Sequence, residues 1–314
     1  MAHFAHIGMS TSEWHLKTPV AFLIFNRPDT AARVFEAIRS ARPHKLLVVA
    51  DGPRPDRPGE AEKCDATRAI IEQVDWPCEV LKNYSDTNLG CKRRVSSGLD
   101  WVFETAPEAI ILEDDCLPHP SFFRFCEELL ERYREDERIG IISGDNFQFG
   151  KRRTHDSYYF SRYAHIWGWA SWRRTWQKYD AEMKLWPVVK RHEWLSDILR
   201  DKKLVRYWIA IFDDVFNNEI DTWDYQLNFA CWINSILNIM PNDNLISNIG
   251  FRADASRTTK KNKFSEMPIS EMRFPLLHPR IIIRDALADG MRERYQFTKP
   301  IISRIAKKIG RMIA

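Results

Sequence analysis

The chain has 314 residues, of which 44% are hydrophobic and 29% are charged, and its formal net charge at pH 7 is +4. These values are ordinary for a soluble globular protein, and the length allows one large domain or two small ones. A charge of +4 does not indicate a nucleic-acid partner unless the basic residues gather on one face. We therefore expect no nucleic-acid binding.

The sequence also bears on the compartment in which the protein works. The N-terminal segment MAHFAHIGMSTSEWHLK lacks the basic stretch and apolar core of a signal peptide. No apolar run reaches the roughly 20 residues that a membrane-spanning helix requires. The six cysteines are scattered without zinc-ligand spacing, which is typical of small core residues and free thiols. These features predict a cytoplasmic protein.

The first half of the chain alternates between predicted strands and helices. The apolar runs predict strands at 19–25, 45–52, 78–84, 109–112 and 139–146. The connecting segments predict helices capped by Asp29-Thr30, over 64–74, from Gly90 and over 121–135. Continuous apolar strands alternating with helices indicate an α/β fold with a mostly parallel sheet covered on both faces.

After residue 150 the alternation stops. The segment 158–186 is rich in aromatic residues, 189–218 reads as one helix, and 223–237 reads as another. This half is therefore predicted to be largely helical.

Polar residues follow four of the predicted strands at the point where each strand ends. They are Asn26-Arg27, Asp51, the acids 113–115 and Asp145-Asn146. Ligands of parallel sheets gather beyond the carboxyl ends of the strands, so we expect these side chains to converge on one edge.

Three of these residues, Glu113, Asp114 and Asp115, are consecutive carboxylates that directly follow the apolar strand AIIL. Adjacent acids repel one another and resist desolvation, and a divalent cation would relieve both costs. Mg²⁺ usually takes one or two carboxylates together with substrate phosphates. The alternative is a solvated acidic turn that interacts with the N-terminus of the next helix.

The sequence LEDD followed by a short turn, Pro and Phe-Phe resembles the metal motif of GT-A glycosyltransferases, among them N-acetylglucosaminyltransferase I. The chain also resembles a bacterial group of GT-A-like proteins, because NRP, ADGPR, NLGC, LEDDCLPHPSFF, SGDNF and WGWA occur in the same order within residues 18–260. The resemblance implies a Rossmann-like GT-A fold. It divides the chain into an N-terminal extension (1–17), a nucleotide-sugar-binding α/β half (18–150), an acceptor-side half of the same domain (151–295) and a basic amphipathic C-terminal helix (296–314).

The resemblance also implies roles for residues that match its motifs. Asp115 would bind Mn²⁺ or Mg²⁺ directly, and Glu113 and Asp114 would contact the nucleotide or the transferred sugar. Asp51 would accept the N3–H of a uracil, although an Asp before Gly is also a common turn residue. Arg93 would lie near the diphosphate, and Lys92 and Arg94 are expected to be solvated.

Three further parts of the donor site follow. Asn26 and Arg27 are expected at the nucleotide edge, and Asp145 near the donor and the acceptor. Trp169, with Trp167, would be a platform for the donor sugar. The alternative for each Trp is a small aromatic core beneath a loop.

An inverting transfer requires a base that deprotonates the acceptor hydroxyl. The segment DTWDYQ supplies Asp224 as the candidate, with Asp221 in reserve. It departs from the family, whose better-matching Asp falls at Tyr225. A second departure is Arg257, which stands where relatives often have a metal-binding His and could pair with a diphosphate instead.

The C-terminal sequence PIISRIAKKIGRMIA places Ile residues on one helical face and basic residues on the other. This pattern fits contact of residues 300–314 with an anionic membrane, or docking of the Ile face on the protein.

The leading hypothesis is a metal-dependent inverting glycosyltransferase that moves a sugar from a UDP-sugar, with UDP-N-acetylglucosamine as one candidate, to a hydroxyl of a bacterial surface glycan or a lipid-linked glycan. The alternatives are a sugar nucleotidyltransferase and a non-catalytic glycan-binding protein. FLIFNRPDT lacks the glycines that the first alternative usually brings near its first strand.

Overall fold

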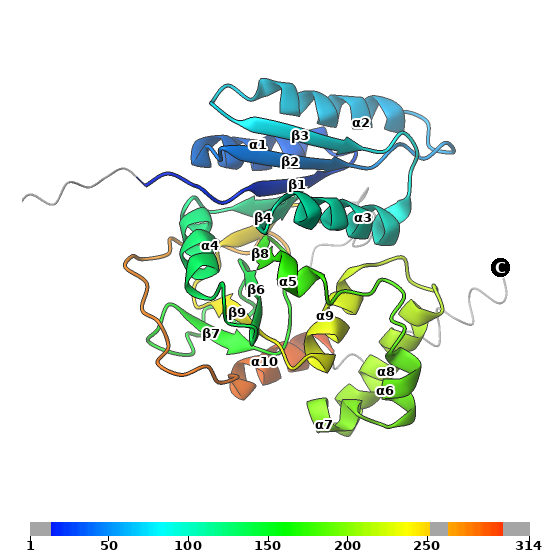
Figure 1. The fold of residues 1–314 in the computed structure, drawn as a ribbon, viewed down its shortest axis with the longest axis vertical. Coiled ribbons are helices and arrows are strands. Elements are labelled where there is room, and N and C mark those ends of the chain that lie inside the picture. The colour runs from blue at the N-terminus through cyan, green and yellow to red at the C-terminus, as the bar shows by residue number, and fades with distance from the viewer. Residues whose placement is uncertain (1–13, 252–262, 298–314) are drawn as a thin grey trace, which may run out of the picture.

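The computed structural model describes residues 14–251 and 263–297 (Figure 1). The expectations for residues 1–13, Arg257 and the segment 298–314 lie outside the described residues. All six cysteines are free thiols. Among the described residues, no helix has both the length and the apolar character needed to cross a membrane.

The core of the fold is an eight-stranded sheet with the order β3-β2-β1-β4-β8-β6-β9-β7. Six strands run in one direction, and β8 and β7 run against their neighbours. The strands are β1 (Val20–Ile24), β2 (Lys45–Ala50), β3 (Glu79–Tyr84), β4 (Glu108–Glu113), β6 (Ile139–Ser143), β7 (Tyr158–Ser161), β8 (Trp169–Trp172) and β9 (Leu237–Pro241). A small second sheet pairs β5 (Cys116–Pro118) with β10 (Ile246–Asn248).

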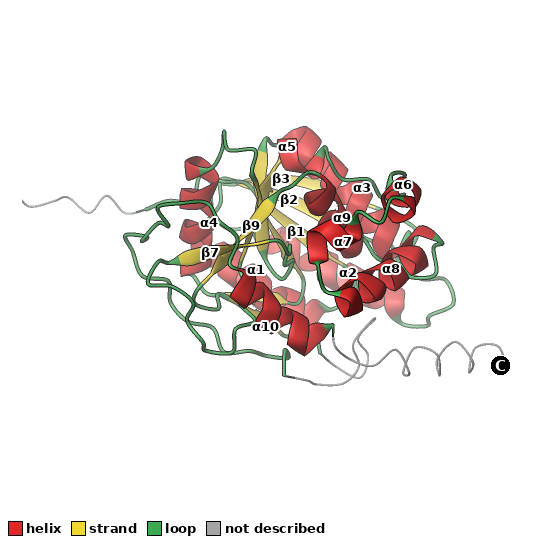
Figure 2. Cartoon of the chain, turned by 90° about the horizontal axis from the view of Figure 1, so that it is seen from below, coloured by secondary structure: helices red, strands yellow, loops and turns green. Residues whose placement is uncertain are grey.

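Helices cover both faces of the sheet, as the strand sequences require (Figure 2). Along β1, Val20 and Phe22 enter the core on one face, and Ala21 and Leu23 enter the core on the other. This alternation follows from the two-residue repeat of a strand, and it makes every residue of β1 apolar.

The first core packs under α1 (Pro28–Ala41), the 3₁₀ turn Ile70–Gln73 and α4 (Ser121–Arg132), and α2 (Glu60–Ala69) packs beside α1. The second packs under α3 (Gly90–Thr105), α5 (Arg173–Trp176), α6 (Trp186–Arg191), α7 (Leu195–Leu199), α8 (Lys202–Phe216) and α9 (Asp224–Ile233). The last helix, α10 (Ala286–Gln296), lies beside β7 at the end of the sheet opposite β3 (Figure 1). The predicted α/β class, with a mostly parallel sheet flanked by helices, is confirmed.

The second half of the chain differs from its predicted helices. The segment 189–218 forms three helices, because Glu193 and Arg200 adopt left-handed backbone angles and the side chain of Asp201 begins α8. The helix predicted at 223–237 ends at Ile233, and the chain re-enters the sheet as β9. Strands β7, β8 and β9 were not predicted.

Candidate functional site

A cavity of about 330 Å³ opens at the carboxyl ends of β1, β2 and β4. Its volume lies at the lower end of the range for small-molecule sites. Among the predicted residues, the cavity brings together Arg27, Asp51, Glu113, Asp114 and the reserve base Asp221. Its wall also includes Phe25, Arg54, Asn88 and Arg94. The predicted edge of the sheet therefore carries a cavity.

Asp51 follows β2 and is held by N–H donors from the loop before α3. Its Oδ1 accepts from the backbone N–H of Gly52 and of Leu89, both at 2.9 Å, and its Oδ2 accepts from the side-chain amide of Asn88 at 3.0 Å. Burial raises the pKa of Asp51, and the two backbone N–H groups oppose that rise. The carboxylate is thus fixed in one orientation at the cavity wall.

Arg27 lies between two of the three consecutive acids. Its Nη1 donates to Asp114 Oδ1 at 3.3 Å and also to Asp115 Oδ2. Burial alone would lower the pKa of Arg27, but attraction to Asp114 and Asp115 raises it above the ordinary value. The positive charge that adjacent buried acids require is therefore supplied, in this structure, by a guanidinium.

Asp114 is the most buried of the three acids. Its Oδ2 accepts from the backbone N–H of Phe25 at 3.0 Å, next to its contact with Arg27. Burial raises the pKa of Asp114 to about 7 despite the opposing attraction of Arg27. Asp114 therefore binds the end of β1 to the end of β4, in addition to any contact with a ligand.

Asp115 begins the turn into β5 and lies against the segment that follows β10. The side-chain amide of Asn248 approaches Asp115 Oδ1 at 3.4 Å. A Cβ atom at Gly250 would lie 2.1 Å from Asp115 Oδ2, so the residue at this position must be glycine for the carboxylate to keep its place.

The residues Arg93 and Arg94 exchange their expected positions. Arg93 is exposed and does not line the cavity, whereas Arg94 is buried in its wall. The guanidinium of Arg94 donates to the backbone oxygen atoms of Ala50 and Asn83, at 3.1 and 2.5 Å. Lys92 is also buried rather than solvated.

The two candidate bases differ in position. Asp221 lines the cavity and accepts from the backbone N–H groups of Cys91 and Lys92 at the start of α3, at 2.9 and 2.8 Å. Asp224, in the first turn of α9, accepts from the hydroxyl of Thr222 and is half-buried. The reserve candidate is therefore the one that faces the cavity.

Three other predicted residues lie away from the cavity wall. The side chain of Asn26 donates to Glu60 at 2.8 Å. Trp169 is fully buried, with its ring stacked on Trp223 at 5.8 Å, so neither face can receive a sugar, in contrast to the predicted platform. Trp167 is half-buried and packs edge-on against Phe251.

Asp145 is also buried, and it accepts a hydrogen bond from Nδ1 of His165 that the sequence did not indicate. Burial and the nearby Arg292 lower the pKa of His165, and they outweigh the attraction of Asp145 that would raise it. The ring of His165 stacks on Phe147 with 4.6 Å between centroids. Asp145 therefore orients His165 within the fold.

A divalent cation would find hard oxygen ligands at this edge. Within residues 14–251 and 263–297, no group of three or more His, Cys, Asp or Glu side chains is arranged to hold a metal ion. Asp115 does not itself line the cavity, but its carboxylate contacts Arg27, which does. A site of one or two carboxylates completed by phosphate oxygens is common for Mg²⁺. The carboxylate of Asp115 fits a metal ion that binds together with a diphosphate. Such an ion would compete with Arg27 for this carboxylate.

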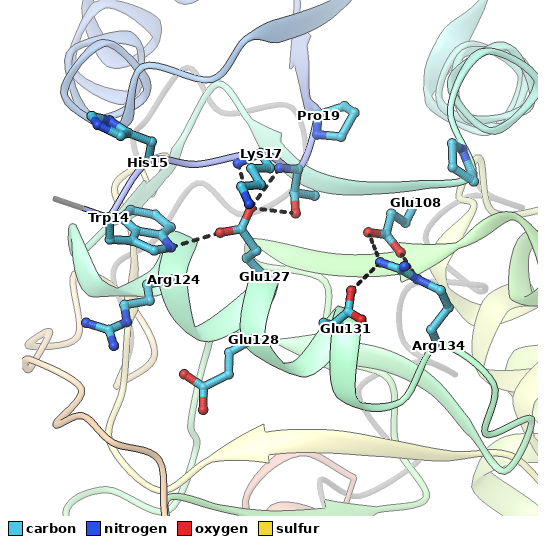
Figure 3. Close-up of a pocket in the computed structure, with 12 residues that line it drawn as sticks. Trp14, His15, Lys17, Pro19, Glu108, Arg124, Glu127, Glu128, Glu131 and Arg134 are labelled. Atoms are coloured by element: carbon cyan, nitrogen blue, oxygen red, sulfur yellow. Dashed lines mark hydrogen bonds and ion pairs between the residues drawn. The ribbon is translucent and has the colours of Figure 1, made fainter. Parts of the chain in front are cut away.

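A second cavity, of about 700 Å³, lies at the opposite edge of the sheet, near the starts of β1 and β4 (Figure 3). Glu108, Glu127, Glu131 and Arg134 in its lining already have partners. Glu127 accepts from the indole N–H of Trp14 and from the backbone N–H of Lys17 and Thr18, and Arg134 pairs with Glu108 and Glu131 (Figure 3). This cavity does not contain the residues predicted to form a site.

Comparison with known proteins gives low similarity. No protein-family model and no curated protein matches the chain. The solved structures that resemble it include a mannosyltransferase, PcManGT from Pyrobaculum calidifontis, in complex with GDP-Man and Mn²⁺, at 14% identity and a TM-score of 0.35 over 53% of this chain and 47% of that one. Another is UDP-glucose pyrophosphorylase complexed with UDP-glucose, at 11% identity and a TM-score of 0.32 over 51% of this chain and 79% of that one. Neither is N-acetylglucosaminyltransferase I, and at these TM-scores the likeness carries no argument about activity.

Proposed function

We propose that the protein is a metal-dependent inverting glycosyltransferase whose donor is a nucleoside-diphosphate sugar. The observation that supports this most directly is the convergence of Arg27, Asp51, Glu113 and Asp114 on one cavity at the carboxyl edge of a mostly parallel sheet. The resemblance of the sequence motifs to GT-A enzymes gives these positions their roles.

Each part of the donor meets a distinct group in this proposal. The nucleobase donates a hydrogen bond from its N–H to the carboxylate of Asp51. Glu113 and Asp114 contact the ribose or the sugar. Uracil presents an N–H between two carbonyl oxygens, so the resemblance favours a UDP-sugar, and UDP-N-acetylglucosamine is the first donor to test. Asp115 would hold Mn²⁺ or Mg²⁺, which neutralises the charge that develops on the leaving diphosphate.

In the transfer itself, an acceptor hydroxyl attacks the anomeric carbon as the bond from that carbon to the diphosphate oxygen breaks. A carboxylate takes the hydroxyl proton, and the nucleoside diphosphate leaves with the electron pair. Asp224 is the base that the sequence motif favours, and Asp221 is the one on the cavity wall. The acceptor is proposed to be a glycan or a lipid-linked glycan, with residues 300–314 as a peripheral membrane contact of a cytoplasmic enzyme.

The purified protein can be screened against nucleotide sugars for metal-dependent release of nucleoside diphosphate. Asp224→Asn and Asp221→Asn should then be compared for turnover and donor affinity. The variant of the true base should lose about 10²-fold or more in turnover with little change in donor affinity. If no nucleotide sugar is turned over or bound, the proposed function is wrong.

A further inference from the structure

The side-chain amide of Asn88 has an orientation that its neighbours determine. Its nitrogen lies 3.0 Å from Asp51 Oδ2 and 3.0 Å from the backbone oxygen of Gly52. Both of these atoms can only accept hydrogen bonds, so the NH₂ group of Asn88 must face them. The reverse orientation would place the amide oxygen of Asn88 against two other acceptor oxygens. The carbonyl oxygen of Asn88 is therefore the end that is left for a ligand.

Asp51 and Asn88 together form a wall of acceptors. The Oδ1 atom of Asp51 already accepts the backbone N–H groups of Gly52 and Leu89, and its Oδ2 accepts from the side chain of Asn88. A carboxylate oxygen accepts more than one hydrogen bond, so Oδ2 keeps capacity for a donor from a ligand. Both residues line the cavity at the carboxyl edge of the sheet. A ligand at this wall meets two oxygen acceptors side by side, the carboxylate Oδ2 and the amide Oδ1.

The guanidinium groups of Arg54 and Arg94, which line the cavity with this wall, already have partners. The guanidinium of Arg94 donates to Ala50, Asn83 and Ser97. That of Arg54 donates to Glu60 and lies 5.7 Å from the ring centre of Phe25, which also lines the cavity. Phe25 with Arg54 offers a flat apolar and cationic surface, which suits the face of a planar base.

The four common nucleobases differ in how they meet two adjacent acceptors. Uracil presents one N–H between two carbonyl oxygens, so one of its oxygens would oppose Asn88 Oδ1. Cytosine and adenine each place a ring acceptor next to their amino group. Guanine presents its ring N1–H and its exocyclic amino group as neighbouring donors, and it is the base that satisfies both oxygens.

We propose that this wall selects guanine, with Asp51 Oδ2 accepting the ring N1–H and Asn88 Oδ1 accepting the exocyclic amino group. This rests on the proposed function, because it takes the cavity as the nucleotide site, and it replaces uracil, which Asp51 considered alone would favour. The donor class is then a guanosine-diphosphate sugar, and Asn88 is a specificity-determining residue.

The test is calorimetric titration of the full chain, with Mn²⁺ present, against GDP, UDP and inosine diphosphate, which keeps N1–H but lacks the exocyclic amino group. Wild-type protein should bind GDP at least about tenfold more tightly than either of the others, the scale of one hydrogen bond together with the penalty for an unpaired acceptor. In Asn88→Ala, GDP and inosine diphosphate should bind equally. Asn217→Ala, an exposed position at the end of α8, is the matched control and should keep the wild-type ratio.

Each other outcome has a definite meaning. Equal or tighter binding of UDP in wild-type protein overturns the guanine assignment and leaves the proposed function standing. A GDP preference that persists unchanged in folded Asn88→Ala overturns the role of Asn88. The wild-type comparison of GDP with inosine diphosphate decides the assignment even if the variant does not fold. Absence of binding of any nucleoside diphosphate contradicts the proposed function itself.

Discussion

The Nη1 atom of Arg27 contacts both Asp114 and Asp115, at a place where the sequence had indicated either a metal ion or a solvated acidic turn. A buried carboxylate without a partner is costly, so the guanidinium stabilises this edge whether or not a cation binds. A metal that arrives with a diphosphate would take over part of this charge balance. The charge of Asp114 and Asp115 can therefore be balanced by Arg27 alone, or by Arg27 together with a metal ion that arrives with a diphosphate.

The first prediction concerns Arg27→Gln, which removes the positive charge and keeps most of the side-chain length. The free energy of unfolding should fall by about 2 kcal/mol, less than the ~3–5 kcal/mol for breaking a buried pair, because the side chain of Arg27 is 22% exposed. Urea unfolding measures this. Arg39→Gln breaks an exposed pair with Asp75, which solvent screens, and should cost clearly less than Arg27→Gln. Equal losses in the two variants would contradict the role given to Arg27.

A second prediction concerns pH and His165, whose pKa is lowered by burial. An unfolded His takes up a proton near pH 6.5, whereas folded His165 takes it up only at lower pH. Its contribution to stability is therefore fully present above about pH 6.5 and is lost as the pH falls below that value.

This dependence can be measured as the urea midpoint at pH 7.5 and pH 5.0. His165→Gln should lose less stability between the two values than wild-type protein does. His192→Gln, at an exposed position, should follow the wild type. A loss in His165→Gln as large as that in the wild type would show that His165 does not carry the effect.

At the scale of elements, the connection between α8 and α9 is fastened to α3 through Asp221. The two backbone N–H groups that donate to Asp221 lie in the first turn of α3, where N–H groups have no partner within the helix and where phosphate oxygens also bind well. The carboxylate of Asp221 and a donor diphosphate would compete for the same groups.

Asp221→Ala should therefore have two effects of opposite sign. Stability should fall by about 1 kcal/mol, the usual cost of losing a helix cap, while the affinity for nucleoside diphosphate rises. Thermal melting and calorimetric titration measure the two effects. Asp201→Ala removes the equivalent cap of α8 and should lower stability without changing nucleotide affinity. Weaker nucleotide binding in Asp221→Ala would mean that the carboxylate supports the site.

The elements of the first half were predictable because apolar runs and turn residues agree there. The helix predicted at 64–74 begins earlier, at Glu60, and α1 begins with Pro28 in its first turn rather than with the predicted Asp29-Thr30 cap. In the second half, β8 consists of Trp, Ala, Ser and Trp and lies buried between β4 and β6. These four residues show no alternation of apolar and polar side chains, so the sequence alone does not distinguish this strand from a buried loop.

The site was predictable to the level of the sheet edge and less so to individual residues. Arg94 shares a helical face with Gly98 and Val102 at four-residue intervals, a spacing that would have placed it, rather than Arg93, toward the sheet. The hydrogen bond between Asp145 and His165 joins residues 20 positions apart, one just after β6 and the other between β7 and β8, and no local pattern encodes it. The orientation of Asn88 likewise depends on contacts with Asp51 and Gly52.

For the whole molecule, both halves of the chain contribute strands to one sheet, and the cavity lies on the first half with Asp221 reaching it from the second. A donor held by the first half would thus be met by an acceptor-side group from the second. The same sheet thus carries both hydrophobic cores on its faces and the small polar cavity at the carboxyl ends of its strands.

The central claim is that this edge of the sheet binds a nucleoside diphosphate together with a divalent cation held by Asp115. The measurement is calorimetric titration of GDP and UDP into wild-type protein and Asp115→Ala, each with and without Mn²⁺, with Asp156→Ala at a distant half-buried acid as the matched control. We predict binding that requires Mn²⁺ in the wild type and the control and is lost in Asp115→Ala, which stays folded although its melting temperature falls because Arg27 loses one of its two carboxylate partners. Binding to Asp115→Ala with unchanged affinity and unchanged metal dependence, or binding to no protein under any condition, would contradict the account.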